Sequence, residues 1–149
     1  MIVKTKPFGT IEVDERQKLR FPHGILGFEN LMNYVLLDAT EPPFYWLQSL
    51  DEPDVAFVLI DPSFFKPDYS HDLPEEDLDG IGLADTGDQL VFAIVTIPEN
   101  HSLMTANLQG PLVINKANKL GRQSITTNPR WLVRHYILEE LAAVKDRAC

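Results

Sequence analysis

The alternation of apolar and polar positions between residues 9 and 120 predicts short β-strands joined by turns. Apolar runs, some alternating with polar residues and some continuous, are separated by proline or glycine almost throughout this region. The runs are too short for helices, and no helical spacing lies between them. The expected strands cover residues 10–13, 33–37, 44–48, 55–60, 89–97, 111–114 and 123–127.

The run QLVFAIVTI at residues 89–97 is the longest continuous apolar stretch and is rich in β-branched residues. We expect it to form a central strand that is buried on both faces. Strands spaced this regularly, without helices between them, favour an antiparallel sandwich or small barrel over a parallel α/β sheet. We therefore predict a mainly β fold, an antiparallel small β-barrel-like single domain over residues 1–149, with a short C-terminal helix.

The segment after residue 127 is compatible with two structures. Asn128 followed by Pro129 is typical of a helix start, and apolar residues follow at helical spacing over residues 131–141. A strand over residues 132–136 is the alternative. A helix over residues 137–147 is predicted in either case, because its acids come early and its bases late, as the helix dipole favours.

Negative charge is concentrated in one part of the chain. Residues 38–88 contain fourteen acids and one base, Lys66, whereas the remainder contains eight acids and twelve bases, so the two parts carry −13 and +4. Acids at this density repel one another unless they face solvent or a positive partner. The segment is therefore a candidate surface for a basic partner, and an acidic surface that only confers solubility is the alternative. Within it, residues 66–88 predict a projecting loop with a short helical turn over residues 74–78, capped by Asp72.

The remaining composition is typical of a cytoplasmic domain. The apolar fraction of 44% is sufficient for a core. The single cysteine, Cys149, excludes an intrachain disulfide and favours a reducing compartment. The sequence contains no signal-peptide core and no apolar run of about 18 residues, so we expect no membrane segment. Its acidic balance argues against direct contact with nucleic acid.

Motifs for catalysis or metal binding are not evident in the sequence. The histidines lie in different segments without HExxH spacing, and neither a GxSxG elbow nor a P-loop is present. A triad assembled from distant residues stays open, since triads are recognised by geometry. Residues 75–80 match the first half of an EF-hand loop, but Thr86 stands where a bidentate glutamate is needed. HGILGF at residues 23–28 predicts a tight turn between strands, because no basic residue or helix start follows to hold a phosphate. We expect no enzyme activity, metal or cofactor.

Eight sequence blocks occur in a fixed order along the chain. They are FPHGILGF (21–28), PFYWLQSL (43–50), FVLIDP (57–62), KPDY (66–69), AIVTIP (93–98), TANLQGPLVIN (105–115), GRQ (121–123) and RH (134–135). Together they resemble the FliW family of flagellar assembly factors over nearly the whole chain, whereas the tail after His135 departs from the family pattern.

The resemblance implies a cytoplasmic, non-enzymatic binding protein with two alternative partners. One partner is flagellin. The other is the carbon storage regulator CsrA, a basic dimeric RNA-binding protein that represses translation of flagellin messenger RNA, and free FliW would capture it once flagellin is exported. A flagellin-binding chaperone or structural module without an RNA-regulator partner is the alternative. We expect a monomer.

Residues for both contacts are predicted in or beside the acidic segment. Acids docked beside an RNA site would repel its phosphates. The acids expected to contact CsrA are Asp72, Glu75, Glu76, Asp77 and Asp79, followed by Asp51, Glu52 and Asp54. Flagellin needs an exposed apolar groove for its amphipathic helices. The groove candidates are Phe64, Phe65, Tyr69, Ile81 and Leu83.

Two further sets of residues are expected to have structural roles. The expected core residues are Phe44, Trp46, Leu47, Phe57 and Phe92. The side chains expected to bond strand ends or bulges are those of Gln48, Asn107, Asn115 and Gln123.

Overall fold

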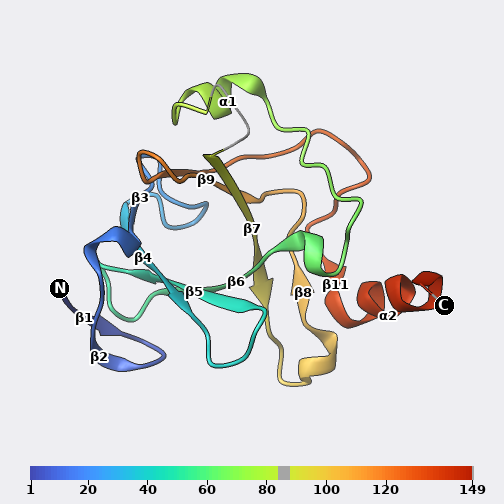
Figure 1. Cartoon of the computed structure of the whole chain (residues 1–149), viewed down its shortest axis with the longest axis horizontal. Coiled ribbons are helices and arrows are strands. Elements are labelled where there is room, and N and C mark those ends of the chain that lie inside the picture. Colours follow the sequence, from blue (N-terminus) through green and yellow to red (C-terminus); the bar gives the residue numbers. More distant parts are fainter. Residues whose placement is uncertain (84–87, 149) are drawn as a thin grey trace.

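The chain forms a closed barrel of seven strands in the computed structural model, which describes residues 1–83 and 88–148 (Figure 1). The barrel is closed because β7 pairs with β6 on one edge and with β9 on the other. In barrel order the strands are β7 (Gln89–Thr96), β6 (Ala56–Ile60), β5 (Phe44–Ser49), β4 (Asn33–Asp38), β3 (Lys18–Arg20), β10 (Leu120–Gln123) and β9 (Leu112–Asn115).

The barrel is mixed, although almost all of its pairings are antiparallel. The exception is the contact between β3 and β10, which is parallel and joins Arg20 to Leu120. The prediction of a small, mainly β barrel with a short C-terminal helix is confirmed, because helix α2 spans Ile137–Ala148. Strand 89–97 is likewise central, since β7 contacts three other strands.

Strands outside the barrel extend it on two sides. The second half of β7 pairs with β8 (Thr105–Ala106), and β8 pairs with β11 (His135–Tyr136). Strands β1 (Ile2–Thr5) and β2 (Gly9–Glu12) form a separate hairpin. This hairpin packs on the barrel through a buried apolar cluster of Val3, Val13, Val35 and Leu37.

Two predicted elements in the second half of the chain are wrong in position or type. The strand expected at residues 123–127 does not form. Instead β10 ends at Gln123, the residue at which the expected strand would have begun. The helix predicted from Asn128 does not form; the Asn128 side chain caps one turn by accepting the N–H of Arg130 at 3.0 Å. The chain then enters β11, so the strand alternative is confirmed over His135–Tyr136, and α2 begins at the next residue.

The segment at residues 66–88 contains the predicted short helical turn as α1 (Glu75–Asp79), which projects at the top of Figure 1. Asp72 is not its cap: Pro74 precedes the helix, and the Asp72 carboxylate accepts a hydrogen bond from Asn128 Nδ2 at 2.8 Å. An apolar cluster anchors this segment on the barrel. Its buried members are Leu73, Ile81, Leu83 and Val113 of β9.

The barrel interior is filled by aromatic and aliphatic side chains. Phe21 and Tyr34 are fully buried and meet edge to face with ring centroids 5.4 Å apart. Gly121 permits this packing, because a Cβ there would lie 2.5 Å from the Phe21 ring. Of the expected core residues, Leu47 and Phe92 are buried in this cluster, and Phe57 is half-buried against it.

Candidate partner-binding surfaces

The carboxylates of α1 divide into one structural and several exposed groups. Asp77 is half-buried; it accepts a hydrogen bond from Ser124 Oγ at 2.5 Å and pairs with Arg122 Nη2 at 3.2 Å. It therefore ties the helix to the region around β10. Glu75, Glu76 and Asp79 are exposed, and none of them forms an ion pair within the described residues.

The other predicted acids occupy a different place, the turn between β5 and β6. Asp51 accepts the backbone N–H groups of Met32 and Asn33, each at 3.0 Å. The hydrogen bond from Asn33 is the largest cause that holds the Asp51 pKa below its usual value. Asp51 thus stabilises the start of β4, whereas Glu52 and Asp54 are exposed on the same turn.

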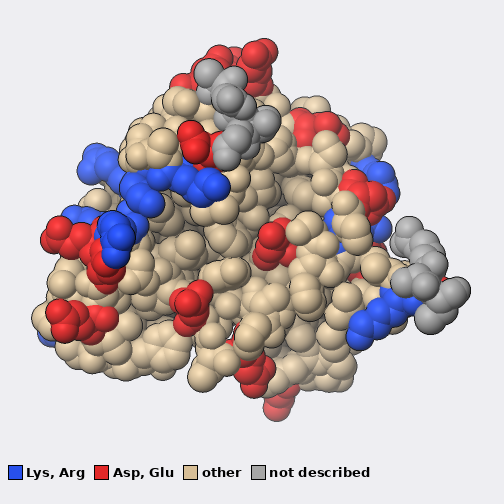
Figure 2. All heavy atoms as spheres, viewed as in Figure 1, with Lys and Arg blue, Asp and Glu red and all other residues tan. Residues whose placement is uncertain are grey.

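The acids of residues 38–88 do not form one continuous surface, contrary to the prediction. Asp38 and Glu41 lie at the β4–β5 turn, at the opposite end of β5 from Asp51 and Glu52. Figure 2 shows acids in several separate groups on this face, one of them at the top over α1 and some beside lysine and arginine. The physical reason is topological, since consecutive turns of an antiparallel sheet alternate between its two ends.

The apolar groove predicted for flagellin is not formed by the expected residues. Phe65, Ile81 and Leu83 are buried, and only Phe64 exposes a large part of its side chain, 47%. Tyr69 is half-buried, because its ring packs on Trp131 and its hydroxyl donates to the carbonyl of Leu108 at 2.9 Å. The loop that was expected to expose these groups uses them as anchors on the barrel.

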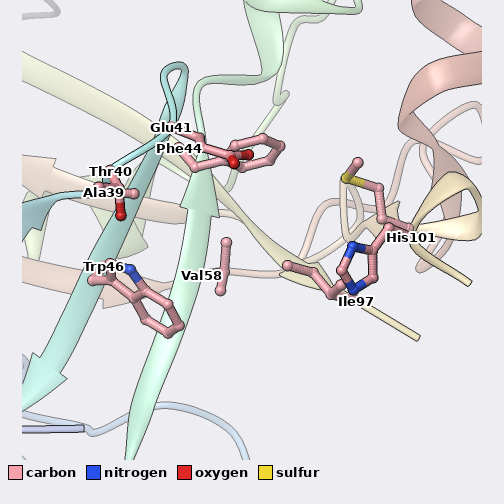
Figure 3. Close-up of a pocket in the computed structure, with 9 residues that line it drawn as sticks. Ala39, Thr40, Glu41, Phe44, Trp46, Val58, Ile97 and His101 are labelled. Carbon is pink, nitrogen blue, oxygen red and sulfur yellow. The ribbon is translucent and has the colours of Figure 1, made fainter. Parts of the chain in front are cut away.

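An open apolar groove lies elsewhere, beside the β4–β5 turn. It has a volume of 290 Å³, and its polar lining consists of Thr40, Glu41 and His101. Figure 3 shows side chains from the β4–β5 turn, from β5 and β6, and from the segment after β7 around one cavity. The apolar lining residues are Ala39, Phe44, Trp46, Val58, Ile97 and Met104.

The assignment of Phe44 and Trp46 to the core holds only in part. Each is half-buried and packs against a buried apolar cluster, but each also lines this groove. Alternate residues of a strand point to opposite faces. Leu47 faces the barrel core, whereas Phe44 and Trp46 face outward. The strand FYWLQS begins with apolar residues on both of its faces, so the sequence alone did not show which face is exposed.

The four polar side chains expected to bond strand ends do so. Gln48 is fully buried; its Oε1 accepts the N–H of Lys6 at 2.8 Å, and its Nε2 donates to the carbonyl of Ser49 at 2.9 Å. Asn107 Oδ1 accepts the N–H groups of residues 109 and 110. Asn115 donates to the Ile81 carbonyl at 2.9 Å, and Gln123 donates to residue 110. The prediction is confirmed.

The histidines and carboxylates do not assemble a recognisable reaction centre in the part of the chain that the structure describes. His71 contacts Gln89 at 2.6 Å, and His135 accepts the N–H of Leu132 at 2.8 Å. None of the hydrogen bonds in residues 1–83 and 88–148 joins a serine to a histidine. The same residues contain no group of three potential metal ligands, and Thr86 of the EF-hand comparison lies outside them.

The surface of the described chain thus offers grooves and projecting charged turns. None of its helices is long and apolar enough to cross a bilayer. The fold is shared with a solved structure, the crystal structure of the flagellar assembly factor FliW, with a TM-score of 0.84 and 36% identity over 92% of this chain and 96% of the other. The molecule is therefore a small β-barrel of the flagellar assembly factor class.

Sequence comparisons identify the family within this class. The family model for FliW protein matches residues 2–137. The chain is 46% identical to the flagellar assembly factor FliW of Treponema denticola, over 96% of this chain and 97% of the relative. It is 48% identical to that of Leptospira interrogans, over 94% of this chain and 95% of the relative. The chain belongs to the FliW family, whose members are non-enzymatic assembly factors.

Proposed function

We propose that this protein binds flagellin in the cytoplasm and alternatively binds and antagonises CsrA, which couples flagellin export to flagellin synthesis. When flagellin has been exported, free protein captures CsrA, and translation of flagellin messenger RNA resumes. The observation that carries the flagellin half of this proposal is the open apolar groove of Figure 3 in a member of the FliW family.

The groove suits an amphipathic helix, because such a helix docks by laying its apolar stripe into an apolar groove. Phe44, Trp46 and Val58 provide aromatic and branched contact area, and Ile97 exposes 46% of its surface at the rim. Apolar surface clustered in this way is typical of an interaction site. The helices that flagellin buries in the filament core present a matching stripe while flagellin is monomeric.

The test is a titration of the purified protein with monomeric flagellin. Ile97→Asp places a charge at the groove rim and should weaken binding by about tenfold or more, because the charge must be desolvated on docking. Ile125→Asp is the matched control, since Ile125 is equally apolar and 49% exposed but lies outside the groove. Equal affinity of the Ile97→Asp variant and the wild type would refute the groove assignment.

CsrA binding is the second half of the proposal, and the exposed acids on α1 favour it. A basic partner docked on Glu75, Glu76 and Asp79 gains favourable contacts, and the same acids repel phosphates that approach its RNA site. Two unit charges about 10 Å apart interact by roughly 0.4–1.7 kcal/mol at effective dielectric constants of about 20–80. A few acids therefore suffice to weaken RNA binding several-fold without steric overlap.

Charge reversal tests this half separately. Changing Glu75, Glu76 and Asp79 together to lysine should weaken CsrA binding and abolish RNA displacement. The matched control reverses the exposed acids Glu12, Glu15 and Glu99, which alters the net charge equally. If wild-type protein binds flagellin but leaves CsrA and its RNA unaffected, the protein is a flagellin chaperone or structural module without an RNA-regulator partner.

A further inference from the structure

A second apolar feature lies beside α1, at the tip of the turn formed by residues 22–29. Leu26 at this tip is 75% exposed, and Ile125, almost a hundred residues later, is 49% exposed. Both line one cavity of 180 Å³, together with His23, Arg122 and Gln123. We call Leu26, Ile125 and this cavity the apolar patch.

The exposure of Leu26 is fixed by the backbone of its turn. Gly24 has a φ of +65°, and a Cβ there would lie 2.5 Å from the Glu29 Cα, so only glycine fits. The buried Ile25 anchors the turn, and its carbonyl accepts the N–H of Phe28 at 2.6 Å. Leu26 is therefore held in solvent by its neighbours, which limits the entropy that a partner must remove on docking.

The two sides of the patch are joined by the half-buried side chain of Gln123. Gln123 Oε1 accepts the N–H of Leu26 at 2.8 Å, and its Nε2 donates to the Gly110 carbonyl at 3.0 Å. The Ile125 side chain lies over Gly110, where an added Cβ would be 3.0 Å from Ile125 Cδ1. The cavity thus has walls of fixed position, as a docking pocket requires.

Negative charge borders the patch on two sides. Arg122 in the cavity wall is paired with Asp77 of α1, so its own charge is compensated and the exposed acids of α1 lie next to the cavity. On the other side Glu29 accepts the N–H of Gly27 at 3.1 Å, which lowers the Glu29 pKa and keeps it ionised. A partner that complements this surface carries an apolar side chain surrounded by basic groups.

We propose that CsrA docks on the apolar patch, placing an apolar side chain between Leu26 and Ile125 and basic groups toward Glu29 and α1. This inference rests on the proposed function, and it assigns to CsrA recognition a contact that is apolar as well as electrostatic. Flagellin and a second copy of this chain are the competing occupants.

The test is a titration of purified CsrA against variants at the patch. Leu26→Asp and Ile125→Asp should each weaken CsrA binding by about tenfold or more, since central apolar anchors dominate interface energetics. Leu132→Asp is the matched control, because Leu132 is 54% exposed and lies outside the cavity. All three positions are exposed, so the fold should tolerate the changes, and thermal unfolding checks this. CsrA affinity of Leu26→Asp within about twofold of the wild type would overturn the proposal.

Salt separates the apolar contact from the charged one. At roughly 1 M salt the screening length falls to about 3 Å, so the effect of Glu76→Lys should shrink. The loss caused by Leu26→Ala should persist, because apolar burial is not screened. A Leu26→Ala effect that disappears at high salt would overturn the proposal.

The competing occupants give different outcomes. If Leu26→Asp weakens flagellin binding as strongly as CsrA binding, or if wild-type protein alone forms dimers that Leu26→Asp dissociates, the patch belongs to another partner and the proposal fails. Wild-type protein that does not bind CsrA at all would overturn the proposed CsrA function as well, whereas wild-type binding with unaltered variants overturns only the patch.

Discussion

His135 is a buried titratable group whose hydrogen bonds depend on its charge state. Its Nε2 accepts the N–H of Leu132 at 2.8 Å, which requires that nitrogen to be unprotonated. Nδ1 lies 3.9 Å from Glu140, but that carboxylate is already paired with Lys66 at 2.7 Å. Burial therefore outweighs the attraction of Glu140 and lowers the His135 pKa from 6.5.

This shift predicts a loss of stability in mild acid. The unfolded chain takes up a proton at His135 below a pH of about 6.5, whereas the folded chain resists it, so the stabilisation is complete above that pH and declines as the pH falls. His71 contributes in the same direction, because burial also lowers its pKa. Urea unfolding at about pH 8 and about pH 5.5 should therefore show a larger loss for the wild type than for His135→Gln.

The glutamine in this variant keeps an acceptor near Leu132 but does not titrate. His101→Gln, which removes an exposed imidazole, is the control and should follow the wild type. An identical pH dependence of His135→Gln and the wild type would show that this side chain does not contribute.

Helix α1 is too short to be stable alone, so its position depends on the apolar side chains beneath it. Ile81 is 2% exposed and packs with Leu73, Leu83 and Val113, and its carbonyl accepts amide hydrogens from Asn115 and Asn118, each at 2.9 Å. The acids proposed to contact CsrA are therefore held in place by a residue that was itself expected to be exposed.

Ile81→Ala should lower the free energy of unfolding by about 2–4 kcal/mol, because it leaves a cavity in this cluster. It should also weaken CsrA binding, although no acid is changed, because α1 loses its fixed position. Chemical denaturation and CsrA titration measure the two effects. Ile2→Ala, at a position 69% exposed, should change neither. Normal CsrA affinity in a destabilised Ile81→Ala protein would show that α1 does not need this anchor.

The elements that could be predicted are those with a recognisable pattern of apolar residues within their own segment of the chain. Strands β4 to β7 are five to eight residues long and each contains a run of apolar residues, and all were expected within a few residues of their positions. Strands β3, β8 and β11 have only two or three residues and exist because distant segments supply their partners, which spacing along the chain does not reveal. The surfaces depend on the same long-range contacts, so Phe65 and Ile81 were wrongly expected to be exposed. For the same reason, the sequence did not reveal that Trp46 lines the groove as well as packing on a buried cluster.

At the scale of the whole molecule, the proposed flagellin groove and the apolar patch lie at opposite ends of β4. The turn that carries Leu26 returns to the barrel where Phe21 N–H donates to the Met32 carbonyl at 2.7 Å, just before β4 begins. The β4–β5 turn that lines the groove follows the other end of the strand. A strand of this length spans about 17–20 Å, so the two surfaces do not overlap.

One bound partner then excludes the other by a steric clash between the two partner proteins, and not because both contact the same residues. A short helical peptide that carries one apolar stripe of flagellin should therefore bind the groove with the same affinity, within about twofold, whether or not CsrA is bound. Fluorescence anisotropy of the labelled peptide measures this with free and with CsrA-saturated protein. Ile97→Asp should weaken peptide binding in both states. If CsrA instead releases the peptide from wild-type protein, the two ends of the barrel must be coupled by a conformational change, since a peptide of this size cannot reach the patch.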